Sequence, residues 1–206
     1  SPPSFSSSTS TSAMGASDSS SSNPASSGTS ISEISGSSSV KPIIKTTLEQ
    51  VRNFDVGVVA SIQGTVLVPP GILSSQYMYV GDTKGIGIQV YSYKKDFPEV
   101  AVGDQVTLSG EIAEVSGEMR LKVASATDIH SSSYTLPVVP QKLEAVDVGE
   151  LYEGGLIEIA GEVTGVKGSY VYLDDGTDEV KVYIRGGSGI DKKLFNEGSH
   201  ALIAGI

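Results

Sequence analysis

The chain has 206 residues, and its 24 acidic and 14 basic side chains give a formal net charge of −10. Such an acidic balance repels nucleic acid and anionic membranes at long range, although it leaves room for a local basic groove. The chain has no cysteine, which excludes disulfides and thiolate metal sites, and no apolar run approaches the roughly 20 residues that span a bilayer.

Residues 1–40 form a low-complexity leader in which about half of the residues are serine, and Asp18 and Glu33 are its only charged side chains. This leader has too little apolar surface to offset the entropy of ordering it, so we expect a flexible segment, with its Ser and Thr residues as candidates for attached glycans. The chain begins with Ser rather than Met. These features fit an exported protein whose signal was removed, or else a fragment, and predict an extracellular or cell-surface location.

The rest of the chain repeats itself at an offset of roughly 95 residues, which is about right for a small domain. Residues 48–51 (LEQV) recur as 143–146 (LEAV), and Gly64-Thr65-Val66 recurs as Gly161-Glu162-Val163. We therefore predict two tandem β-domains. Their boundaries are a first domain at 41–130, a Pro-containing linker at 131–142 and a second domain at 143–206. We expect the linker to be extended and to lack regular hydrogen bonding.

Five strands are predicted in the first repeat from runs of β-branched and aromatic residues between turn signals. They cover residues 58–68, 76–80, 86–91, 105–112 and 119–123. Gly64 offers a bend in the first strand. Five strands with such a bend, and a connection before the fourth, predict a small closed barrel.

The second repeat shows four such strands and a short helical connection. The strands cover residues 156–163, 170–173, 179–184 and 201–206, and the connection covers 190–195. By the internal alignment Gly205 corresponds to Gly110, so the second barrel is expected to lack its closing strand and to have open edges. Natural proteins avoid such edges.

The pattern Gly103-Asp104-Gln105-Val106 at the fourth strand, together with the stretches 85–96 and 117–120, resembles the OB-fold. In particular, it is similar to the OB domains attached to secreted bacterial nucleases and to lamin-tail-type surface proteins. The likeness covers residues 48–130 and, more weakly, 143–206. It implies an all-β protein with two tandem five-stranded OB-like barrels.

The OB resemblance implies that a ligand would bind the exposed face of the second and third strands. The candidate stacking residues are Tyr77, Tyr79, Tyr91 and Tyr93, and the candidate phosphate-binding residues are Lys94, Lys95, Arg120 and Lys122. Further candidates are Lys84 and the second-repeat residues Tyr170, Tyr172, Tyr183, Lys181 and Arg185. The alternative is structural: by alternation, the tyrosines also fit core positions or cross-strand pairs.

The sequence gives little support for a metal site or for catalysis. Asp174-Asp175-Gly176 lacks the spacing of a calcium loop and is interpreted as a hairpin turn. His130 and His200 lie in different repeats, so no metal site, cofactor site or catalytic constellation is predicted, and the chain is expected not to be an enzyme.

Two functions are therefore expected. The first is an exported structural or interaction protein that binds copies of itself through β-strand addition. Its expected assembly residues are Ile43, Ile44 and Ile206. The segment at 31–34 is a second choice for the added strand. The alternative is a module that binds single-stranded DNA or RNA along the first barrel.

Overall fold

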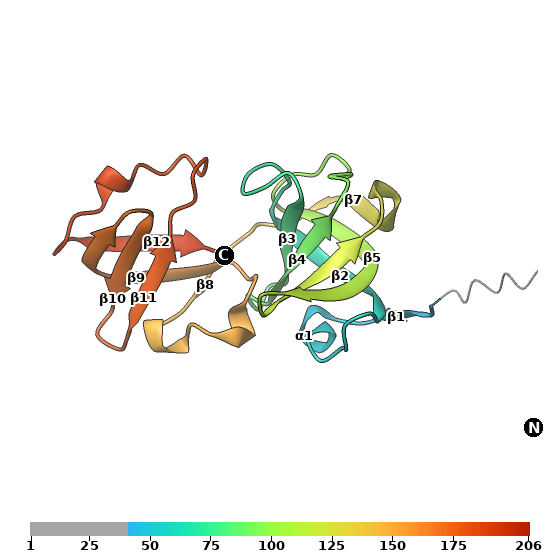
Figure 1. Cartoon of the computed structure of the whole chain (residues 1–206), viewed down its shortest axis with the longest axis horizontal. Helices are drawn as coiled ribbons and strands as arrows, with labels where there is room; N and C mark the ends of the chain where they lie inside the picture. Colours follow the sequence, from blue (N-terminus) through green and yellow to red (C-terminus); the bar gives the residue numbers. More distant parts are fainter. Residues whose placement is uncertain (1–40) are drawn as a thin grey trace, which may run out of the picture. The chain divides into compact units, whose positions relative to one another are not determined.

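The first half of the protein is a closed barrel of five strands. The computed structural model describes residues 41–206, which belong to one compact unit, and the predicted leader (1–40) lies outside the described residues. The barrel strands are β2 (Val59–Val68), β3 (Tyr77–Gly81), β4 (Gly87–Ser92), β5 (Asp104–Val115) and β6 (Glu118–Val123). They pair in the order β2-β3-β4-β6-β5, and β5 returns to β2 to close the barrel (Figure 1). The predicted all-β class and OB-like barrel are confirmed here.

Strand β6 completes this barrel because it pairs with a neighbour on each side. It runs parallel to β4, with Val90 beside Leu121, and antiparallel to β5, with Ile112 beside Leu121. All three of these side chains are fully buried. At Gly110 the strands come so close that an added Cβ would stand 2.6 Å from the carbonyl oxygen of Lys122. A glycine is therefore required at this corner of the barrel.

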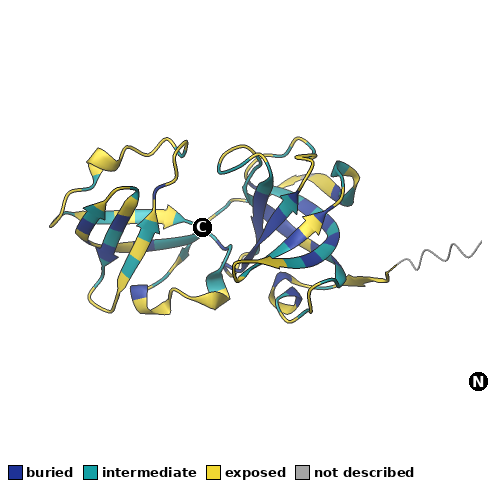
Figure 2. Ribbon diagram, viewed as in Figure 1, coloured by how far each residue is buried: buried dark blue, intermediate teal, exposed yellow. Residues whose placement is uncertain are grey.

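The core of the barrel consists of the inward-facing residues of all five strands, shown dark blue in Figure 2. A short helix, α1 (Leu48–Val51), covers one end and adds two buried side chains to this core. Its first turn is capped by Thr47, whose hydroxyl oxygen accepts a hydrogen bond from the backbone N–H of Gln50 at 3.2 Å.

Two further strands extend the sheet of the first half. Strand β1 (Ile43–Lys45) lies parallel to β2, and β7 (Ile129–Thr135) lies antiparallel to the N-terminal half of β5. The prediction that the linker at 131–142 lacks regular hydrogen bonding is therefore wrong for residues 131–135, and also for Gln141 and Lys142, which pair with Ile157 and Glu158. The physical reason is that β6 pairs only with the C-terminal half of β5, so the N-terminal half has a free edge that β7 occupies.

The second half is a smaller sheet with the order β11-β10-β9-β12, in which β8 also pairs with β9. Its strands are β8 (Gln141–Lys142), β9 (Ile157–Lys167), β10 (Tyr170–Asp174), β11 (Glu179–Tyr183) and β12 (His200–Gly205). Residues 41–206 also contain four short 3₁₀ turns: η1 (Ala126–Asp128), η2 (Ala145–Asp147), η3 (Glu150–Tyr152) and η4 (Lys192–Leu194). The last of these occupies the predicted helical connection.

This second sheet is open. Within residues 41–206, β11 pairs only with β10 and β12 pairs only with β9. The buried apolar cluster is correspondingly small, consisting of Val163, Val171, Leu173 and Ile184. A second tandem barrel therefore stays a prediction. None of the helices in the described part of the chain is long and apolar enough to cross a membrane.

Candidate functional site

The outer surface of β3, β4 and β6 carries most of the predicted ligand-binding residues. Because Met78, Val90 and Leu121 point into the core and are fully buried, the residues that alternate with them point outward. Cross-strand pairing places Tyr91 between Tyr77 and Lys122, and Gln89 between Tyr79 and Arg120. We call this surface the tyrosine face; it consists of Tyr77, Tyr79, Gln89, Tyr91, Glu118, Arg120 and Lys122.

Tyr91 and Arg120 form the stacked centre of the tyrosine face. The guanidinium carbon of Arg120 lies 4.1 Å from the centroid of the Tyr91 ring, which is the geometry of a cation–π contact. The hydroxyl of Tyr91 accepts a hydrogen bond from the side-chain amide of Gln76 at 3.3 Å. Both Tyr77 and Tyr91 are half-buried. Their rings are thus held in place but not removed from solvent, as a stacking surface requires.

Tyr79 has a different role from the one predicted. Its side chain is only 8% exposed, and its ring meets that of Tyr77 edge-on at 5.7 Å between centroids. Its hydroxyl donates to Oε1 of Glu118 at 3.0 Å and accepts from Nε2 of Gln89 at 3.0 Å. Burial raises the pKa of Tyr79 well above its ordinary value, although the hydrogen bond from Gln89 opposes this. Tyr79 therefore anchors the face, and its burial fits the structural alternative, a core or cross-strand position, rather than a stacking residue.

The remaining predicted residues lie beyond the end of β4. Tyr93 is 76% exposed, and Lys94 and Lys95 are exposed beside it. The backbone N–H of Lys95 bonds to the carbonyl of Ser92, which makes this segment a tight turn. The structure therefore places three of the eight predicted binding residues in a turn next to the tyrosine face, and the other five on it.

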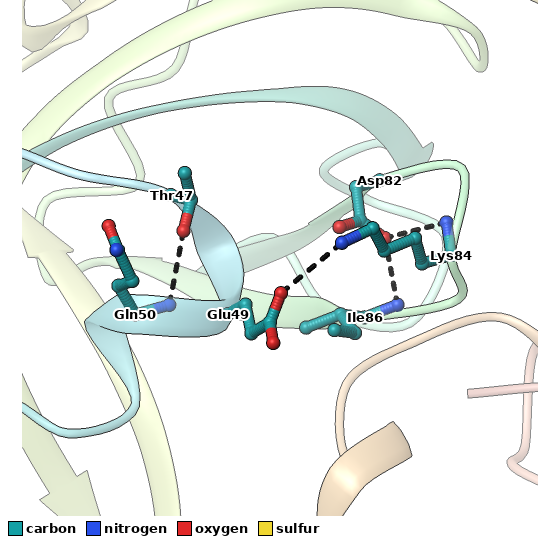
Figure 3. Close-up of polar contacts among 6 residues, drawn as sticks. All are labelled: Thr47, Glu49, Gln50, Asp82, Lys84 and Ile86. Carbon is teal, nitrogen blue, oxygen red and sulfur yellow. Dashed lines mark hydrogen bonds and ion pairs between the residues drawn. The ribbon is translucent and has the colours of Figure 1, made fainter.

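Lys84 belongs to the turn between β3 and β4, on another side of the barrel. Its ammonium group pairs with Glu49 at 3.3 Å, while Asp82 accepts backbone hydrogen bonds from Lys84 and Ile86 (Figure 3). Both members of the ion pair are largely exposed, and an exposed pair contributes little to stability. The pairing nevertheless directs Lys84 toward α1, so the tyrosine face does not include it.

Two charged side chains from the second half approach this region. Arg185, which was among the further candidates, lies 5.7 Å from the Tyr77 ring. Glu153 is partly buried, and its pKa is raised first by desolvation and then by the neighbouring charges of Glu150 and Glu118, while Arg52 opposes the shift. Arg52 itself donates hydrogen bonds to the backbone carbonyls of Gly87, Glu150 and Glu153.

The second half keeps part of the same surface pattern. Tyr170 and Tyr183 pair with centroids 5.3 Å apart, and the ammonium group of Lys181 lies 4.0 Å from the Tyr170 centroid. The ammonium group of Lys167 likewise lies 5.7 Å from the Tyr172 centroid. By the internal repeat, Lys181 stands where the first barrel has Gln89. The second surface therefore lacks the uncharged amide that, in the first barrel, helps Tyr79 to hold the carboxylate of Glu118.

The acidic turn at 174–176 is held by local hydrogen bonds. Asp175 accepts bonds from the hydroxyl and backbone N–H of Thr177, at 2.6 and 2.9 Å, and from the backbone N–H of Ala145 at 2.7 Å. These bonds lower the pKa of Asp175 to about 2. Among the described residues, no cluster of three or more His, Asp or Glu side chains is arranged to hold a metal ion.

The predicted assembly residues are all on the surface. Ile43 and Ile44 are 57% and 44% exposed, and Ile206 is 42% exposed. The strand that contains Ile43 and Ile44 already pairs with β2 of its own barrel. Among the described residues, β1 is an edge strand with β2 as its single partner, so the assembly role of Ile43, Ile44 and Ile206 stays a prediction.

Sequence reasoning missed Gln76, Gln89 and Glu118. The signal for the last two was present, since alternation along β4 and β6 places Gln89 on the face of Tyr91 and Glu118 on the face of Arg120. Gln76 lies just before β3 and carried no comparable signal. What could not be read was the contact between strands, which depends on the register of β3, β4 and β6.

No protein-family model and no curated protein matches this chain. Two solved structures are similar to part of it. The hypothetical protein ygiW from E. coli is 19% identical, covers 42% of this chain and 88% of its own, and superposes with a TM-score of 0.34. The OB domain (residues 67–166) of MM0293 from Methanosarcina mazei is 18% identical, with 44% and 87% covered and a TM-score of 0.36. At these scores, the barrel assignment relies on the strand order described above.

Proposed function

We propose that the first barrel is a non-enzymatic module that binds single-stranded nucleic acid on the tyrosine face. The observation that carries this proposal is the stack of Arg120 on Tyr91, with Tyr77 on one side and the exposed Lys122 on the other. A base that stacks on an aromatic ring gains about 1–3 kcal/mol, and this gain does not depend strongly on sequence. Lys122, with Lys94 and Lys95 in the adjacent turn, would neutralise phosphates.

The acidic balance of the chain limits how strong this binding can be. With a net charge of −10, the protein repels a polyanion at long range, so binding depends on local contacts and weakens steeply with salt. The exposed acidic residues of the second half make the first barrel the better site. We therefore expect measurable affinity at low ionic strength and little at high ionic strength.

The test is fluorescence anisotropy with a labelled oligothymidylate of about 12 nucleotides, which fits the site size of one OB barrel. Tyr91→Ala should weaken binding roughly ten-fold, which corresponds to about 1.4 kcal/mol. Tyr134→Ala is the matched control, because Tyr134 is 64% exposed on β7 and lies off the tyrosine face. Undetectable binding at low salt, or equal loss in both variants, would contradict the proposal.

A second candidate is self-association of an exported protein by β-strand addition. The supporting observation is that β11 and β12 each have only one partner strand within residues 41–206, while Leu202 on β12 is 65% exposed. Sedimentation velocity of the purified chain tests it. Leu202→Lys should abolish any association, because a charge on an edge strand opposes pairing with another edge. A wild-type protein that sediments as a monomer at all concentrations would contradict this candidate.

A further inference from the structure

The second half of the chain is held against one end of the tyrosine face. At Gly87, the first residue of β4, an added Cβ would collide with the backbone of Gly154, so the two backbones touch with no room for a side chain. Arg52 joins the same place, because its guanidinium group donates hydrogen bonds to the carbonyl of Gly87 at 3.0 Å and to the carbonyl of Glu153. The second half is therefore in backbone contact with the strand that carries Tyr91.

Arg185 brings a cation from the second half to the other end of this face. It follows Ile184, which is buried and whose backbone N–H donates to the carbonyl of Ser169 at 2.8 Å. The carbonyl of Arg185 accepts a hydrogen bond from the backbone N–H of Ser188 at 3.2 Å. From this fixed backbone, the guanidinium carbon of Arg185 reaches a point 5.7 Å from the centroid of the Tyr77 ring, within the roughly 6 Å range of a cation–π contact. A ligand that lies against Tyr77 therefore meets Arg185.

Two guanidinium groups from different halves thus lie beside neighbouring rings. Tyr77 and Tyr91 are direct cross-strand partners, with Arg185 at the first ring and Arg120 at the second. Among residues 41–206, neither arginine forms an ion pair with a carboxylate. An anion bound beside them would be attracted by both charges, and a guanidinium group binds phosphate through two parallel N–H donors. This end of the face is therefore suited to phosphate.

The opposite end of the tyrosine face is acidic. Glu118 on β6 lies level with Gly87, because the parallel register advances by one residue on each strand. Glu153 of the second half adjoins Gly87 through the shared hydrogen-bond donor described above. Carboxylates at this end repel a polyanion. The charge pattern therefore directs a single strand across the Tyr77 end of the face, toward Arg185.

We infer that Arg185 of the second half binds a phosphate of the single strand on the tyrosine face, so that the nucleic-acid site is built from both halves of the chain. This inference rests on the proposed function, because it requires a strand on this face. By the internal repeat, Arg185 belongs to a separate surface of the second half, and its contact with Tyr77 joins it to the first. The strand passes from the turn at Lys94 and Lys95 along the tyrosines to Arg185.

The experiment measures the affinity of the full chain for labelled oligothymidylate of about 12 nucleotides, by fluorescence anisotropy over a range of salt concentrations. Arg185→Ala should reduce the slope of log affinity against log salt by about 0.7, the value for one phosphate contact on a single strand. The same contact corresponds to a loss of roughly five- to ten-fold in affinity at about 50 mM salt. Lys193→Ala is the matched control, because it removes one positive charge from an exposed position on η4 of the second half and should leave the slope unchanged.

The wild-type protein supplies a second measurement that no folding defect can affect. In an NMR titration with the same oligonucleotide, the guanidinium N–H signal of Arg185 should shift with the same saturation curve as the amide signal of Tyr77. If Arg185→Ala keeps the wild-type slope while Tyr91→Ala weakens binding, the second half is not part of the site but the proposed function stands. Equal losses in Arg185→Ala and Lys193→Ala, or an Arg185 signal that does not move at saturation, overturn the inference. If no oligonucleotide binds at low salt, both proposals fail.

Discussion

Closure of the first barrel can be tested by comparing Val90→Ala with Val182→Ala, two substitutions at equivalent positions of the repeat. Val90 on β4 is fully buried between Met78 and Leu121, its neighbours on either side. Val182 on β11 pairs only with Val171 among the described residues and is partly exposed. Both positions carry valine, so a difference between the two losses of stability reports the second neighbouring strand, β6, that Val90 has and Val182 lacks.

The expected magnitudes follow from burial. Val90→Ala removes two buried carbon atoms at about 0.8 kcal/mol each, and a cavity term brings the loss to about 2–3 kcal/mol. Val182→Ala removes the same atoms from a site that water already reaches, so the loss should be about 1 kcal/mol or less. Urea unfolding followed by circular dichroism measures both. With a slope of about 1–3 kcal/mol per molar urea, Val90→Ala should lower the midpoint of its transition by roughly 1 M. Equal losses in the two variants would show that β6 does not close the barrel as described.

Three further predictions concern charge and protonation. Replacing Lys94 and Lys95 together with Ala should weaken single-strand affinity and reduce the slope of log affinity against log salt by about 1.4, as measured by salt titration. An unchanged slope would place the phosphates elsewhere. The raised pKa of Tyr79 means that its proton stabilises the folded state below pH 10.0 and that this contribution is lost at higher pH, so Tyr79→Phe should flatten the fall in melting temperature above that value. Asp175 has the opposite sign: its folded pKa of about 2 lies below the ordinary 3.8, so its contribution is present above pH 3.8 and lost as the pH falls toward 2. Asp175→Asn should therefore remove part of the acid dependence of the melting temperature, and an identical pH profile would contradict this assignment.

The strands of the first barrel could be predicted from the sequence because each carries a local signal. Residues 58–68 and 105–112 are rich in β-branched residues and coincide closely with β2 and β5. Glycine and aspartate mark the turn that separates β3 from β4, where Asp82 binds two backbone N–H groups. The pairing order then follows from the few ways in which five short strands can close a barrel.

The parts that could not be predicted depend on contacts between distant segments. The Ser-rich segment that contains β7 has little strand propensity of its own, and it becomes a strand because β5 offers it a free edge. Tyr79 and Tyr77 occupy the same face and have the same side chain, yet only Tyr79 is anchored by Gln89 and Glu118. Alternation places a residue on a face, but it does not reveal which neighbour across the strands will bury it.

The central claim is that single-stranded nucleic acid binds the face formed by β3, β4 and β6, and backbone NMR tests it most directly. Titration of the isotope-labelled protein with oligothymidylate at low salt should shift the amide signals of Tyr77, Tyr91 and Arg120 most strongly. Smaller shifts are expected at Lys94 and Lys95 in the adjacent turn. Shifts confined to the second sheet or to β7, or no shifts at all at saturating oligonucleotide, would contradict the assignment of this face as the binding site.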